Sequence, residues 1–213
     1  MVKRKLSVKA MVLLSILGAW AIVLRFIDFP ILPAAPFLKI DFSDLMALIG
    51  MLAYGPVGLV IVAGIRDVVN YITGGGEAGI PIGVIMSFIA TLAMFLPTHF
   101  ILKYTRAKRS TFTAILMSIT LTASLVVSMS LINYYVALPI YTTVLNFPID
   151  DFIAYIMSVI IPFNLIKGII LSIGQVIVIR SIVPILEKRD MLYPSYHEKV
   201  RLERPVQPSE SHA

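Results

Sequence analysis

Two polar residues, Asn164 and Lys167, interrupt the long apolar stretch at residues 152–186. They are three positions apart, so a helix would place them on one face. A lysine at the centre of a helix in lipid costs about 2.5–3.5 kcal/mol on insertion scales, so we expect this face to point into a bundle interior or a cavity. The alternative is that Lys167 reaches the membrane surface while Asn164 bonds a neighbouring helix.

A second candidate for ligand contact is Asn133, which opens the tyrosine-rich segment 133–141. Its amide donates and accepts hydrogen bonds at once, as recognition of the edge of a heterocycle requires. Neighbouring tyrosines such as Tyr135 offer flat apolar faces to the rings of such a ligand. For Tyr134 the simpler explanation is a place in an interfacial aromatic belt.

The charged residues between positions 41 and 67 have simple structural explanations. Asp41 or Ser43 is expected to cap a helix, and capping together with the helix dipole would account for both Asp41 and Asp44. Arg66 and Asp67 are expected to form an ion pair with each other.

Several kinds of chemistry are excluded by what the sequence lacks. Without cysteine there are no disulfides, iron–sulfur clusters or thiolate zinc sites. The run Gly74-Gly75-Gly76 lacks the Gly-Lys-Ser/Thr that follows in a phosphate-binding loop, so this chain alone cannot drive transport with ATP. No HExxH spacing or paired intramembrane carboxylates appear, which argues against an enzyme. We therefore expect no catalytic residue and no cofactor.

The elements that must position these residues are transmembrane helices, because 58% of the chain is hydrophobic and only 14% is charged. We predict an all-α integral membrane protein with six transmembrane helices at residues 8–27, 41–54, 56–71, 80–102, 112–133 and 152–186. The first of them is kept as a permanent span rather than a cleaved signal peptide. The second is too short for a full crossing. Pro162 and Pro184 predict a kink or an end in the last helix.

Positive charge predicts the orientation of these helices. All but four of the 18 Lys and Arg residues flank the spans on one side, the exceptions being Arg25, Lys39, Arg66 and Lys167. By the positive-inside rule both termini are cytoplasmic and the protein lies in the cell membrane. The net charge of +6 therefore reflects orientation in a lipid bilayer rather than binding to nucleic acid.

The chain divides into a membrane-embedded domain, residues 1–186, and a polar cytoplasmic tail, residues 187–213, for which we expect little fixed structure. Between the first two helices, the proline-rich apolar segment 28–41 lies on the outer side. It is either a connector at the lipid headgroups or a lid that folds over the short second helix and roofs a cavity. Since the last helix enters from outside, the three features described above can converge on one outward-facing ligand pocket.

The first helix carries small residues at intervals of four, Ser7, Ser15 and Ala19, interrupted by Met11. Small residues permit close approach of another helix. Ser15 and Ala19 are therefore candidates for docking a partner protein, although packing within the chain would explain the same pattern.

The sequence Leu-Pro-Ala-Ala-Pro-Phe-Leu-Lys-Ile-Asp-Phe-Ser-Asp at 32–44, with Pro-Phe-Asn-Leu-Ile-Lys-Gly at 162–168 and the region of Asn133, resembles a family of vitamin transporters. The family is the riboflavin-specific substrate-binding (S) component, RibU type, of energy-coupling factor (ECF) transporters. The resemblance covers most of the chain. It implies capture of flavin from outside and energy from a separate module, comprising a coupling transmembrane protein and two ATPases.

Carried onto this sequence, the resemblance implies that Asn133, Asn164 and Lys167 contact the isoalloxazine edge or the ribityl chain, and that the first loop closes the site. The expected ligand-binding residues are Phe37, Leu38, Lys39, Asp41, Asn133, Tyr135, Asn164 and Lys167. Whether flavin mononucleotide is accepted besides riboflavin stays open. The alternatives are an S component for another vitamin and a self-sufficient secondary transporter, which commonly shows internal repeats that are not evident here.

Overall fold

The computed structural model describes residues 7–33, 35, 38–76, 79–107 and 110–197. Phe37, one of the expected ligand-binding residues, lies outside these ranges. The elements in chain order are α1 (Val8–Arg25), β1 (Phe29–Pro30), β2 (Lys39–Ile40), α2 (Ser43–Tyr54), α3 (Pro56–Gly74), α4 (Ile82–Thr105), α5 (Thr111–Ile132), η1 (Asn133–Ala137), α6 (Leu138–Val144), α7 (Phe152–Tyr155), η2 (Ile156–Ile160), α8 (Ile161–Lys188) and η3 (Pro194–Tyr196). Of these, η1 and η2 are π-helical and η3 is a 3₁₀ turn.

Five helical segments within the described residues are long and apolar enough to cross a membrane: α1, α3, α4, Thr111–Val144 and Phe152–Lys188. The remaining apolar helix, α2, has 12 residues. At 1.5 Å per residue it is about 18 Å long and falls short of a hydrocarbon core of about 30 Å. The predicted helical membrane protein and its short second helix are both confirmed, but the all-α expectation is corrected by the small antiparallel hairpin of β1 and β2.

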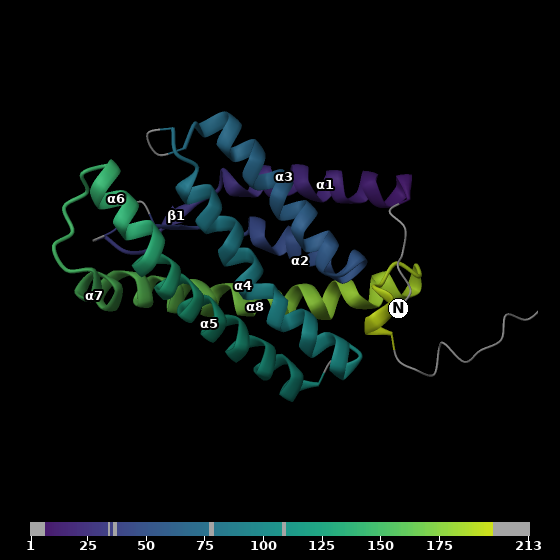
Figure 1. The fold of residues 1–213 in the computed structure, drawn as a ribbon. Coiled ribbons are helices and arrows are strands. Elements are labelled where there is room, and N and C mark those ends of the chain that lie inside the picture. The colour runs from purple at the N-terminus through teal and green to yellow at the C-terminus, as the bar shows by residue number, and fades with distance from the viewer. Residues whose placement is uncertain (1–6, 34, 36–37, 77–78, 108–109, 198–213) are drawn as a thin grey trace, which may run out of the picture.

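The short helix α2 is surrounded by longer ones. It packs between α1 and α3 on one side and α8 on the other, while α4 and α5 complete the bundle (Figure 1). Its apolar residues Leu48, Met51 and Leu52 are fully buried, as is Phe95 of α4. Burial on all sides explains why a helix too short to cross a bilayer can be stable in this fold.

Glycine permits the close contact between α2 and α3. Gly55 joins the two helices with a positive φ of 67°, a conformation that glycine adopts at little cost, and Pro56 begins α3. A Cβ atom at Gly50 would lie 2.8 Å from the carbonyl oxygen of Gly58, and one at Gly58 would overlap the carbonyl of Gly50. The two backbones therefore touch directly, which fixes α3 against α2.

Each of two prolines follows a five-residue π segment. The segment η1 precedes Pro139 and η2 precedes Pro162. Proline lacks an N–H and clashes with the carbonyl one turn earlier, and a wider turn accommodates both defects without ending the helix. The predicted end of the fifth helix at residue 133 is therefore wrong, because the tyrosine-rich segment 133–141 is helical and the chain stays helical to Val144. The possible helix end at Pro184 is also absent, since α8 continues to Lys188.

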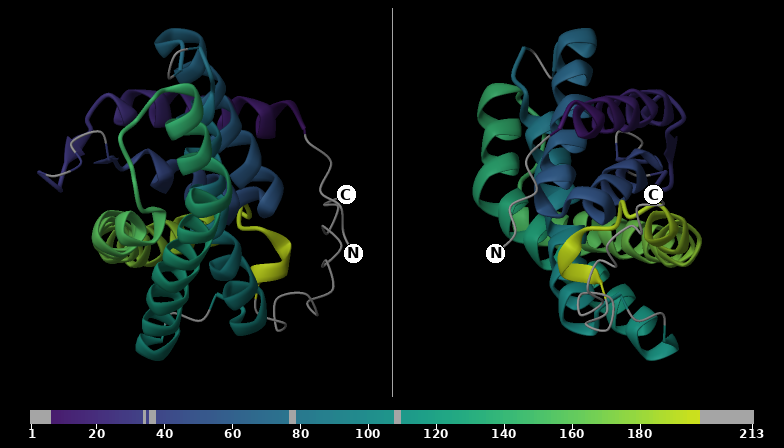
Figure 2. Two further views of the ribbon diagram at one scale, coloured as in Figure 1. Left: turned by 60° about the vertical axis from the view of Figure 1, so that its left-hand side comes forward. Right: turned by 90° about the vertical axis from the view of Figure 1, so that its right-hand side faces the viewer.

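The expectation of little fixed structure after residue 186 is wrong for residues 191–196, which we call the C-terminal hook. The backbone N–H of Tyr193 donates to the carbonyl of Leu52 at 2.8 Å. Leu192 and Tyr196 are buried, and the hook lies beside α4 (Figure 2). The prolines and charges around these residues suggest a solvated tail. Packing of Leu192, Tyr193 and Tyr196 against the core stabilises the hook despite that composition.

The Tyr196 hydroxyl lies 2.6 Å from Nδ1 of His99 on α4. Burial, and secondarily the nearby Tyr193, raises the pKa of the Tyr196 hydroxyl well above its ordinary value. It therefore keeps its proton, and one hydrogen bond joins the hydroxyl to the imidazole, with the donor set by the imidazole tautomer.

The start of α1 and the hook lie at one end of the molecule, and the β1–β2 hairpin, α6 and α7 lie at the other, which we call the hairpin end (Figure 1). Phe29 pairs with Ile40, and Pro30 with Lys39, in antiparallel register.

Candidate functional site

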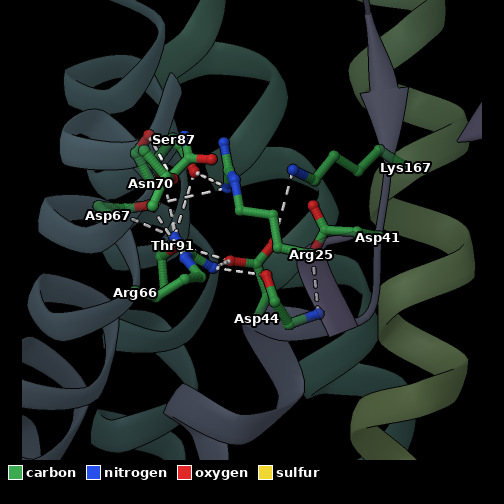
Figure 3. A network of polar contacts seen from close by, with 11 residues as sticks. Arg25, Asp41, Asp44, Arg66, Asp67, Asn70, Ser87, Thr91 and Lys167 are labelled. Carbon is green, nitrogen blue, oxygen red and sulfur yellow. Dashed lines mark hydrogen bonds and ion pairs between the residues drawn. The ribbon is translucent and has the colours of Figure 1, made fainter. Parts of the chain in front are cut away.

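A buried guanidinium, that of Arg66 on α3, organises the polar interior of the bundle. The side chain is 1% exposed and donates from all three nitrogens (Figure 3). Nε and Nη2 bind the two carboxylate oxygens of Asp67, each at 2.9 Å, which confirms the predicted ion pair. The further acceptors are Asp44 Oδ1 at 2.6 Å, Thr91 Oγ1 at 2.9 Å, Ser43 Oγ at 3.0 Å and Ser87 Oγ at 3.1 Å.

The explanation of Asp44 as a helix-capping residue is wrong. Its Oδ1 accepts hydrogen bonds from Arg66 and from the Thr91 hydroxyl, the latter at 2.6 Å. The N-cap residue of α2 is Phe42, which provides no side-chain cap, and Asp41 just before it accepts the backbone N–H of Ser43, the first helical residue, at 2.8 Å. Asp44 lies in the first turn of α2 with its side chain turned into the bundle, where α3 and α4 supply the donors.

Lys167 points into the bundle, as predicted. Its Nζ lies 3.4 Å from Asp44 Oδ2, and its side chain is 12% exposed (Figure 3). The alternative, extension to the membrane surface, is therefore wrong.

Arg25 extends the network to α1. Its Nη1 donates to Ser87 Oγ at 2.9 Å and lies 3.6 Å from Asp67 Oδ1. Arg25, Asp67, Arg66, Asp44 and Lys167 thus form a chain of ion pairs from α1 through α3 and α2 to α8 (Figure 3). Pairing removes much of the cost of holding these charges away from water.

The two predicted asparagines lie on neighbouring elements. Asn133 is the first residue of η1 and Asn164 follows η2, and these two π segments contact each other. Both residues are buried, and each Nδ2 donates to the carbonyl four residues earlier, at 2.7 Å and 2.8 Å respectively. Among the described residues no donor reaches either amide oxygen. These oxygens are thus available to a ligand.

One described residue of the first loop, Leu38, packs against the same end of the bundle. Leu38 contacts a small apolar cluster of Leu138, Ile156 and Ile160, which belong to α6 and η2. This contact favours the lid over a connector at the lipid headgroups. The ammonium of Lys39 pairs with Asp28 at 3.0 Å, which joins the two ends of the loop.

Tyr135 differs from the other expected ligand-binding residues. Its side chain is 71% exposed and packs edge-on against Tyr134, with 4.9 Å between ring centroids. The tyrosine ring therefore lies on the outside of the bundle.

The network includes Ser87 and Thr91, which the sequence did not single out, and it gives Arg25 and Asp44 partners that the sequence did not predict. A signal for them was present, because a charged side chain within an apolar helix needs a partner in the bundle. Within the described part of the chain, no cluster of three or more His, Asp or Glu side chains could hold a metal ion.

The residues proposed for partner docking lie on the surface of α1. Ser15 and Ala19 are exposed, as is Met11, and Ser7 caps the helix by accepting the N–H of Ala10. Packing within the chain, the alternative explanation of this strip, is therefore wrong.

Comparisons with known proteins agree with this arrangement. The family described as "ECF transporter, substrate-specific component" matches residues 9–179. The chain is 35% identical over 187 residues to the riboflavin transporter FmnP of Bacillus subtilis (strain 168), covering 86% of this chain and 97% of the relative. It is 34% identical over 191 residues to the riboflavin transporter RibU of Staphylococcus aureus (strain TCH60), covering 87% and 98% respectively.

A solved structure has the same fold. An S component of a bacterial ECF transporter superposes with a TM-score of 0.68 at 35% identity, covering 84% of this chain and 98% of the solved one. Such relatives are transport components rather than enzymes, in agreement with the expectation from sequence. The resemblance seen in the sequence is confirmed, and the chain belongs to the family of substrate-specific components of ECF transporters.

Proposed function

We propose that this chain captures riboflavin from outside the cell, as the substrate-specific subunit of an ATP-dependent ECF transporter. The observation that supports the proposal is that Asn133, Asn164 and Lys167 all turn into the bundle, while Leu38 of the first loop packs on Leu138, Ile156 and Ile160. The names of the relatives, riboflavin transporters at 34–35% identity, support flavin as the ligand.

Each proposed contact follows from the chemistry of its side chain. The amides of Asn133 and Asn164 hydrogen-bond the polar edge of the isoalloxazine ring. The Lys167 ammonium donates to a carbonyl or ribityl oxygen. Leu38 covers the ring system from the loop, and Asp41, beside Lys167 in Figure 3, receives ribityl hydroxyls. Lys39 closes the loop through Asp28. The proposed contacts do not include Tyr135, which is exposed, or Phe37, which lies outside the described residues.

The proposed topology has six helices in the cell membrane with both termini in the cytoplasm. It is supported by the position of the basic residues. The described cations away from the cytoplasmic end, Arg25, Lys39, Arg66 and Lys167, are each paired with an aspartate. Lys103 and Lys188, in contrast, lie in the last turns of α4 and α8.

Energy would come from a coupling transmembrane protein and two ATPases. The exposed strip at Ser15 and Ala19 on α1 is the proposed docking surface, because small side chains allow another helix to approach closely.

Titration of the purified protein with riboflavin, followed by quenching of flavin fluorescence, tests the proposal. Lys167→Met should weaken binding by about 1–3 kcal/mol, because a buried ligand acceptor loses its donor. Lys188→Met is the matched control, since that lysine is exposed near the other end of the same helix. Wild-type protein that binds thiamine or biotin but not riboflavin would replace this proposal with the S component of another vitamin.

The same titration with flavin mononucleotide determines whether the phosphate is accepted. Flavin uptake by cells with and without the ATPase module tests the proposed energy source. Uptake that persists without the module would favour a self-sufficient transporter.

A further inference from the structure

We infer that Asp44 is a positioning residue for ligand binding, whose carboxylate holds the Lys167 ammonium where the ligand meets it. This inference rests on the proposed function, because it assumes that Lys167 contacts the ligand. Asp44 itself is buried, with 2% exposure.

The first step is that Asp44 is fixed in place. Its Oδ1 accepts two short hydrogen bonds, from Arg66 Nη1 and from Thr91 Oγ1, both at 2.6 Å. The guanidinium is itself immobilised by its two bonds to Asp67 on α3. Three helices, α2, α3 and α4, thus determine the position of one carboxylate.

The second step is that the other oxygen of this carboxylate faces Lys167. The separation of Asp44 Oδ2 and Lys167 Nζ is 3.4 Å. A charge-assisted N–H···O bond is usually shorter, at about 2.7–2.9 Å. The ammonium is therefore held by charge, and it donates no hydrogen bond to any described residue. Its donors remain available to a ligand, while its position is restricted by the carboxylate.

The third step concerns what would happen without the carboxylate charge. Arg66 keeps Asp67 as a partner, whereas Asp44 is the carboxylate that pairs with Lys167 among the described residues. Neutralising Asp44 therefore removes the attraction that holds the flexible ammonium in its place. Of the other two carboxylates labelled in Figure 3, Asp67 pairs with Arg66 and Arg25, and Asp41 forms no ion pair with Lys167 in the described part of the chain. Asp44 is thus the group that keeps Lys167 on the ligand side of the bundle.

A double-mutant cycle tests this inference, with riboflavin dissociation constants measured for Asp44→Asn, for Lys167→Met and for the double variant. We expect Asp44→Asn to weaken riboflavin binding about tenfold or more, since asparagine preserves the acceptor for Arg66 and removes the charge. In the Lys167→Met background, Asp44→Asn should change the dissociation constant by less than about threefold, because the ammonium that Asp44 positions is no longer present.

Asp190→Asn is the matched control. It removes an exposed carboxylate that follows α8 and lies outside the ion-pair network, and should leave riboflavin binding within about threefold of wild type. Should Asp44→Asn fail to fold, Thr91→Val takes its place. This change removes one hydrogen bond to Asp44 without altering any charge, and should weaken riboflavin binding about threefold, with no effect in the Lys167→Met background.

The outcomes separate this inference from the proposed function. Wild-type protein that fails to bind riboflavin overturns the proposed function, and the inference with it. Wild-type binding together with unchanged binding by Asp44→Asn overturns the inference alone. Losses that simply add in the double variant would show that Asp44 acts on the fold and not through Lys167, which also overturns it.

Discussion

The C-terminal hook leads to a quantitative prediction, because one hydroxyl ties it to the bundle. Tyr196→Phe removes the hydrogen bond between the hydroxyl and His99 Nδ1 and leaves that buried nitrogen without its partner. An unsatisfied buried group costs about 1–3 kcal/mol. The phenylalanine ring keeps the edge-on contacts with His99 and Tyr193, at centroid separations of 5.6 Å and 5.2 Å. We therefore expect a loss of about 1–2 kcal/mol, against about 3–5 kcal/mol for Tyr196→Ala.

Thermal unfolding of the purified protein in detergent measures the difference. For a chain of this size, 1 kcal/mol corresponds to about 2–4 °C in Tm. Tyr104→Phe is the control, because Tyr104 is 80% exposed at the end of α4, and it should leave Tm unchanged. If Tyr196→Phe and Tyr196→Ala both melted like this control, the hook would not be packed and the composition-based expectation of a solvated tail would stand.

The same tyrosine predicts a pH dependence of the free energy of unfolding. Burial raises the pKa of the Tyr196 hydroxyl in the folded state above its ordinary value, near 10.0. The unfolded state then loses this proton first, so the contribution of Tyr196 is present below pH 10 and declines as the pH rises above that value. The Tm difference between wild type and Tyr196→Phe should stay constant from pH 6 to about 9 and shrink at higher pH. A difference that grows with pH would contradict this assignment.

Three further substitutions test the packing, the network and the docking surface. Gly58→Ala should lower Tm markedly, because its methyl group would overlap the Gly50 carbonyl. Gly64→Ala should leave Tm unchanged, because a methyl group there meets no atom within 4 Å. Equal effects of the two substitutions would contradict the close approach of α2 and α3. Arg66→Met should destabilise by about 3–5 kcal/mol in the same assay, because two buried carboxylates lose their cation, and an unchanged Tm would refute the network. Ala19→Leu should abolish uptake and complex formation while riboflavin binding survives, and lost binding would contradict a separate docking role.

Part of this structure follows from the sequence alone. Apolar runs and their lengths predict a helical membrane protein, because a bilayer accepts few charges and requires every backbone group to be bonded within its segment. The same rule predicts that Lys167 turns inward, since a lysine exposed to lipid is costly. The adjacency of Arg66 and Asp67 in the chain was enough to predict their ion pair. The shortness of α2 was also evident, because the turn at Gly55 limits its length.

Other features required the tertiary structure, because they depend on residues distant in sequence. The carboxylate of Asp44 looks like a capping group until α3 and α4 bring Arg66 and Thr91 to it, from 22 and 47 positions away. Helix continuity through Pro139 depends on a π turn that local propensity does not predict. The hook is stable only where Tyr196 meets His99, 97 positions earlier. Local pattern determines which segments are helices, whereas long-range contacts determine which polar groups those helices bring together.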